Sequence, residues 1–144
     1  MKNPQTLADK LNKEFSNKKL EQIAKRGCCA FVLLWCLGIE PDDTEAILTV
    51  ADMIDEGSLE EDCTVLWAKA IRNLTGRTLK KIDFVDITSI KGIKERTPVL
   101  YKKKPTDKGG HWVGVENGKI KFNPLNYSVC VSEGKPAELR KLVL

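Results

Sequence analysis

The periodicity of apolar residues changes once along the chain, near Gly76, and this change constrains the fold more than any other feature. Before Gly76, apolar residues recur at helical spacing, whereas the segments after it are short and strand-like. Asn117-Gly118, between two of these segments, is a strong hairpin signal. Helices followed by strands define an α+β domain rather than an alternating one. We therefore expect a helical half, about residues 4–75, packed against a small antiparallel sheet from about residues 78–143.

Apolar stripes and helix-ending residues mark the expected elements. The stretch from Ala30 to Leu37 is apolar on every side, so its helix should be buried and should end at Gly38. A later helix should begin after Pro41-Asp42 and stop at Gly57. The other helical stripes are Leu7-Leu11-Phe15, Leu20-Ile23-Ala24 and Trp67-Ala70-Ile71-Leu74, and strands are expected at Leu79–Val85, Pro98–Lys102, His111–Val115, Lys119–Phe122 and Leu139–Val143.

Length and charge favour one ordinary globular domain, residues 1–144, with a core of its own. The net charge of +4 is mild, and the densest basic run, Lys102-Lys103-Lys104, is typical of a solvated loop, so we expect no nucleic-acid partner. The N-terminus is polar, and the first strongly apolar run is too short to span a membrane. We expect a cytoplasmic protein with no membrane partner, and the sequence does not indicate an oligomeric state.

The chain has five cysteines and a single histidine. The cysteine count is odd and no pair has CxxC spacing, so neither a disulfide framework nor a structural zinc site is indicated. We expect no metal and no cofactor. The thiols should be free, and one of them is a candidate nucleophile; they belong to Cys28, Cys29, Cys36, Cys63 and Cys130.

Cys28 has the position that a reactive thiol needs. A cysteine attacks as thiolate, and the amino end of a helix favours that charge. Gly27-Cys28-Cys29-Ala30 lies where a loop is expected to enter the buried helix, with Gly27 allowing a tight turn. Cys29 would point about 100° away around the helix. Most cysteines in apolar helices are structural, so position alone does not identify the nucleophile.

His111 opens a strand after the flexible pair Gly109-Gly110, where its side chain can face a cleft. After the Asn117-Gly118 turn the chain returns to Asn123, whose amide could hold the imidazole in one tautomer. Strict alternation about a two-residue turn puts Asn123 on the opposite face of the sheet. A three-residue turn or a β-bulge near Pro124 would restore it. Asn126 and Asp107 are the reserve orienting groups.

The order Cys, His, Asn resembles that of papain-like cysteine peptidases, and most closely that of bacterial double-glycine leader peptidases. The matching segments are Gln22, six residues before Cys28, then Gly110-His111-Trp112-Val113-Gly114-Val115, and Phe122-Asn123-Pro124. The resemblance implies a papain-like fold in which Cys28 attacks, His111 acts as base and then acid, and Asn123 orients His111. It also implies that Gln22 binds the oxyanion with the backbone N–H of Cys28, and that Trp112 and Gly110 line the substrate cleft.

This family often has a small residue after the nucleophile, where this chain has Cys29. Which cysteine attacks is therefore open, and the spacing from Gln22 favours Cys28. The expected function is a thiol-dependent hydrolase that cleaves a peptide or isopeptide bond in a peptide or protein substrate. The alternatives are a deamidase or acyltransferase using the same pair, an inactive papain-like binding module, a cell-wall amidase lacking the usual Asp-Cys-Ser, and a basic nucleic-acid binder.

Overall fold

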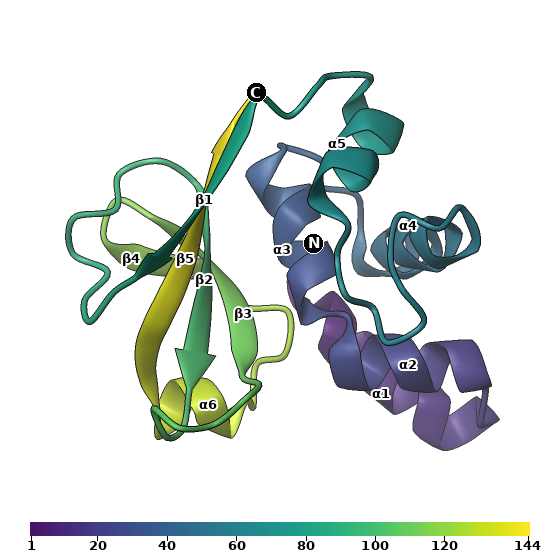
Figure 1. Ribbon diagram of the computed structural model, residues 1–144. Coiled ribbons are helices and arrows are strands. Elements are labelled where there is room, and N and C mark those ends of the chain that lie inside the picture. Colours follow the sequence, from purple (N-terminus) through teal and green to yellow (C-terminus); the bar gives the residue numbers. More distant parts are fainter.

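Five helices precede the first strand in the computed structural model, which describes all 144 residues. The chain is α+β, with these helices on one side and a five-stranded antiparallel sheet on the other (Figure 1). A sixth, short helix falls between the last two strands. The elements are α1 (Pro4–Phe15), α2 (Lys18–Arg26), α3 (Cys28–Cys36), α4 (Asp43–Asp55), α5 (Trp67–Thr75), β1 (Lys81–Asp86), β2 (Thr97–Lys102), β3 (His111–Glu116), β4 (Lys119–Phe122), α6 (Val129–Ser132) and β5 (Lys135–Val143).

The helix boundaries follow the residues that predicted them. Asp42 caps α4, since its side chain accepts a hydrogen bond of 2.9 Å from the backbone N–H of Glu45. Gly76 ends α5 with a φ of 72°, in the left-handed region that glycine adopts without strain. The predicted stripe of α1 is only partly buried, because Phe15 at its end is 66% exposed.

The sheet has the order β1-β5-β2-β3-β4, and all its pairs are antiparallel. The hairpin predicted at Asn117-Gly118 joins β3 to β4, and both residues have positive φ, as a tight two-residue turn requires. The last strand begins at Lys135, four residues before its predicted start at Leu139. The short α6 was not predicted.

Helix α3 connects the two halves of the molecule through its contact with β3. Its residues from Cys28 to Trp35 are all buried, as the uniformly apolar stretch predicts. Gly114 of β3 lies directly under Trp35, and a Cβ at this glycine would come within 2.4 Å of the indole ring. Phe122 of β4 stacks on the same indole with ring centroids 6.1 Å apart. This close approach sets the N-terminal end of α3 beside the start of β3.

The opposite face of the sheet has a smaller core of its own. Val99, Tyr101, Val113 and Val115 form this second cluster, and residues of α6 and of the segment from Ile87 to Ile93 pack on it. None of the helices combines the length and the apolar character needed to cross a lipid bilayer.

Candidate active site

Cys28 is the first residue of α3, as predicted, but no loop leads into it. Gly27 is the only residue between α2 and α3, and it is at once the C-cap of one helix and the N-cap of the other. Its backbone is right-handed, so φ does not require glycine here. The requirement is space, because a Cβ at Gly27 would lie 2.6 Å from the carbonyl oxygen of Ile23.

The Cys28 thiol is held in its neutral form rather than made acidic. Burial raises the pKa of Cys28 above its ordinary value. The backbone N–H groups of Trp112, Cys29 and Cys28 itself favour the thiolate, but they offset only part of this effect. The expected acidic thiol is therefore not the resting state. The contact with the N–H of Trp112 nevertheless places the sulfur beside the residue that follows His111 in the chain.

The other cysteines have less suitable surroundings. Burial raises the pKa of Cys29 well above its ordinary value, raises that of Cys36, and raises that of Cys63 to about 11. Cys29 lines the same cavity as Cys28, but the charged side chain that affects its pKa is Arg140, not the histidine. No pair of cysteines forms a disulfide. Cys28 is thus the thiol that the backbone N–H of Trp112, the residue after the predicted base, contacts.

His111 and Asn123 are brought together. The Nε2 atom of His111 lies 2.7 Å from Oδ1 of Asn123. The backbone N–H of Leu125 also donates to this Oδ1, at 3.3 Å, so that atom is assigned as the amide oxygen. Nε2 must then carry the proton, and Nδ1 is the unprotonated nitrogen. Nδ1 has no partner in the chain, although it is not sealed from solvent.

A β-bulge makes the contact between His111 and Asn123 possible. Val115 pairs with Ile120 and the adjacent Gly114 pairs with Phe122, so Lys121 is an extra residue on β4. This insertion reverses the alternation beyond it and returns Asn123 to the face of His111. The two-residue turn is retained, so of the two predicted remedies the bulge is the one observed.

Burial keeps His111 neutral. The side chain is only 4% exposed, and burial lowers its pKa, while the hydrogen bond to Asn123 offsets part of that shift. A neutral imidazole with Nδ1 unprotonated has the protonation state of a general base.

Cys28 and His111 do not form a hydrogen bond in this structure. By strand alternation His111 lies on the face of Tyr101, with which it is paired, whereas Trp112 and Gly114 face α3. His111 is not among the residues that line the cavity beside Cys28.

The N-terminus of α1 holds the loop that carries Asn123, and nothing in the sequence indicated this contact. The backbone N–H groups of Gln5 and Thr6 donate to the carbonyl oxygen of Pro124, at 3.0 and 3.1 Å. The side chain of Asn3 donates to the carbonyl oxygen of Asn123 at 2.8 Å. The orienting amide is thus fixed from a segment 120 residues away in sequence.

Gln22 does not reach the site. It lies within α2, where Ile23 and Ala24 take the buried face, and its side chain lines two surface hollows near Glu61 that do not include Cys28. Its predicted role as an oxyanion donor has no support from this placement. The reserve orienting groups are engaged elsewhere: Asn126 bonds to Thr6, and Asp107 accepts a hydrogen bond from the backbone of Lys104.

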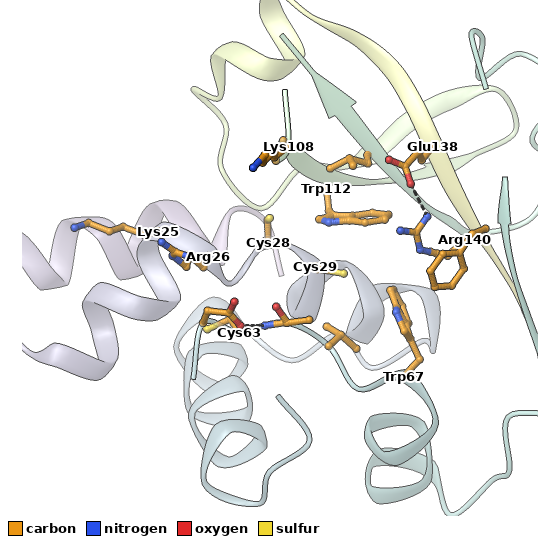
Figure 2. A pocket seen from close by; sticks show the side chains of 17 residues that line it. Lys25, Arg26, Cys28, Cys29, Cys63, Trp67, Lys108, Trp112, Glu138 and Arg140 are labelled. Atoms are coloured by element: carbon orange, nitrogen blue, oxygen red, sulfur yellow. Dashed lines mark hydrogen bonds and ion pairs between the residues drawn. The ribbon is translucent and has the colours of Figure 1, made fainter. Parts of the chain in front are cut away.

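A cavity of about 560 Å³ opens beside Cys28, between the helices and the sheet (Figure 2). Trp112 and Gly110, the two residues expected at a substrate cleft, are among the residues that line it. Trp67 of α5 forms the opposite wall and meets Trp112 edge-on, with ring centroids 6.3 Å apart. A Cβ at Gly110 would fall 2.1 Å from the carbonyl oxygen of Tyr101, so only glycine fits there.

The chain has no cluster of three or more histidine, cysteine or acidic side chains that could hold a metal ion. Comparison with known protein families, curated proteins and solved structures finds no match for this chain.

Proposed function

We propose that the protein is a papain-like thiol hydrolase, a cysteine peptidase in which Cys28 attacks, His111 is the base and Asn123 orients His111. The observation that carries the proposal is the hydrogen bond of 2.7 Å between Nε2 of His111 and Oδ1 of Asn123. This hydrogen bond leaves Nδ1 of His111 as the proton acceptor. The backbone N–H of the next residue on β3, Trp112, contacts the Cys28 sulfur. Acyl transfer by a thiol requires a nucleophile, a base and a group that orients the base, and these three residues have the chemistry for those roles.

The reaction begins from a neutral pair. The Cys28 sulfur turns from the N–H of Trp112 toward Nδ1 of His111, gives up its proton to that nitrogen, and bonds to the substrate carbonyl carbon. Backbone N–H groups at the start of α3 stabilise the oxyanion. The imidazolium then protonates the leaving amine as the carbon–nitrogen bond breaks. Water, deprotonated by His111, hydrolyses the thioester and regenerates the thiol.

The architecture supports the papain-like assignment as well as the chemistry. Cys28 opens the buried helix α3, which lies beside the sheet, and His111 opens strand β3 (Figure 1). A cavity lies beside Cys28, lined by residues of both halves. A deamidase would use the same three residues on a side-chain amide and release ammonia, whereas an acyltransferase would resolve the thioester with an amine or alcohol instead of water. An inactive binding module is the alternative from another class.

Peptidyl chloromethyl ketones test the proposal, because a thiol displaces their chloride much faster when the peptide part binds beside it. We expect Cys28 to be modified first, as located by mass spectrometry of the digested protein. His111→Ala and Asn123→Ala should slow this reaction, about a hundredfold for the base. Cys63→Ser is the matched control and should react like the wild type. Labelling of Cys29 before Cys28, or no effect of His111→Ala, would refute the assignment.

A further inference from the structure

We propose that the cavity beside Cys28 selects substrates with an acidic side chain, glutamate above all, close to the scissile bond. This inference rests on the proposed function and names its substrate class. Its basis is a partly unpaired arginine at the back of the cavity, together with aromatic walls and a basic rim.

Arg140 of β5 lines the cavity and has unused hydrogen-bonding capacity. Its Nη1 donates to Glu138 at 3.1 Å and to the carbonyl oxygen of Leu139 at 3.3 Å. Its Nε is buried without any partner. Nη2 forms no hydrogen bond within the chain and is not sealed from solvent. Nε and Nη2 share one edge of the guanidinium, the edge that binds a carboxylate in bidentate fashion.

The one carboxylate beside Arg140 is shared with a second cation. Glu138 also pairs with Lys102, whose Nζ lies 3.4 Å from its Oε2. The side chains of Arg140 and Lys102 are only 12% and 16% exposed. Arg140, which lines the cavity, therefore shares its carboxylate partner with Lys102, which does not, and the positive charge of Arg140 is only partly neutralised. A substrate carboxylate would neutralise it.

The walls suit the methylene groups of a glutamate side chain. The guanidinium of Arg140 lies 3.8 Å from the ring centroid of Phe84 and 5.0 Å from that of Trp112, as Figure 2 shows for Trp112 and Arg140. Phe84 is 65% exposed, an unusual state for a phenylalanine at a cavity wall, and Leu100 lines the same space. An apolar stem can pack on these rings while its terminal carboxylate meets Arg140.

The rim of the cavity also carries more positive than negative side chains. Lys25, Arg26 and Lys108 line the cavity mouth, where Asp62 is the single acidic residue. Figure 2 shows Lys25 and Arg26 on the α2 side of Cys28 and Lys108 on the side of the sheet. These exposed cations attract an acidic peptide toward the cleft but do not fix its register.

Matched irreversible probes test this selectivity. Acetyl-Glu-Gly and acetyl-Gln-Gly chloromethyl ketones differ only in charge, and versions with the two residues exchanged probe the adjacent position. We expect the glutamate probe to label Cys28 of the wild type about tenfold faster than the glutamine probe, in one of the two orders. Arg140→Met should bring this ratio close to one. Lys141→Met, on the same strand but outside the cavity, should leave it unchanged.

The possible results separate the two proposals. Equal rates for glutamate and glutamine in both orders would overturn the substrate class while labelling of Cys28 upholds the hydrolase. Reaction of Cys28 with iodoacetamide but with no peptide probe would overturn both. If Arg140→Met does not fold, the wild-type ratio still decides, and Lys108→Met measures how much of it the rim supplies.

Discussion

At the scale of single residues, the site combines a thiol and an imidazole that burial holds neutral. The pKa of Cys28 is raised and that of His111 is lowered, each chiefly by burial. The two shifts act in the same direction, because both disfavour a thiolate–imidazolium pair. Proton transfer should therefore accompany the attack on substrate instead of preceding it.

The pH dependence of Cys28 alkylation distinguishes these two possibilities. With iodoacetamide, we expect the rate to keep rising through pH 9, the ordinary pKa of the thiol, because burial raises that pKa. A preformed ion pair would instead give a constant rate from acidic to neutral pH. Peptide-level mass spectrometry at each pH measures the rate for Cys28 alone. A rate that levels off below neutrality would show that the ion pair exists before substrate binds.

Burial of His111 should also make the fold sensitive to acid. Above its ordinary pKa the imidazole is neutral in both the folded and the unfolded chain, and its contribution is fully present. As the pH falls below that value, the unfolded chain binds a proton that the folded chain does not. Stability then decreases by up to about 1.4 kcal/mol per pH unit, until the pH falls below the lowered pKa of the folded state.

The variant His111→Gln lacks this titrating group. Its acidic residues are the same as those of the wild type, so their titration cancels when the two proteins are compared. The difference in urea unfolding free energy between wild type and variant should shrink as the pH falls from 7 to 5. A constant difference would mean that His111 titrates normally in the folded protein.

At the scale of elements, the N-terminus of α1 holds the loop that carries Asn123, although it contributes no atom to the proposed chemistry. Asn3→Ala removes the bond to the carbonyl oxygen of Asn123 and should cost about 1 kcal/mol of stability. It should also loosen the amide that fixes the imidazole. Because His111 is the only histidine, its ¹⁵N chemical shifts report the tautomer without ambiguity. We expect a smaller fraction of the Nε2–H form in Asn3→Ala, and no change in the control Lys10→Ala.

Most elements could be predicted because their signals are local. The Asn117-Gly118 turn, the apolar run of α3 and the glycine at the end of α5 each determine structure within a few residues. The four residues of α6 are too few to show a helical period. The bulge at Lys121 has no residue signature, since it depends on how β4 pairs rather than on which side chain is inserted.

The candidate site was predicted in part for the same reason. The hairpin brings Asn123 back near His111, but the bulge that turns its side chain to the face of His111 could not be predicted. Gln22 was expected beside Cys28 from the resemblance to leader peptidases, but it lies within α2, which continues to Arg26, and its side chain does not line the cavity beside Cys28. The neutral thiol and the contact of α1 with the Asn123 loop depend on packing between distant segments, which local sequence patterns do not indicate.

At the scale of the whole molecule, the cavity lies between two halves that share one core. Phe122 of the sheet belongs to the main apolar cluster, together with residues of α3, α4 and α5. Arg96, from the segment before β2, donates to the carbonyl oxygen of Trp35 at 2.8 Å and lies over its indole ring. Neither half buries its apolar face without the other, so we expect them to unfold together.

Urea unfolding followed by two signals measures this coupling. Far-UV circular dichroism reports mainly the helices, and fluorescence reports Trp35, Trp67 and Trp112, which lie on both sides of the junction. The two transitions should coincide. Gly114→Ala, which forces a Cβ against Trp35, should lower both midpoints by the same amount, corresponding to about 1–3 kcal/mol. Gly92→Ala, with no atom within 4 Å of the added Cβ, should leave both in place. A fluorescence transition that precedes the loss of helix would mean that the halves separate first, and the cavity would then belong to a hinge rather than to a rigid cleft.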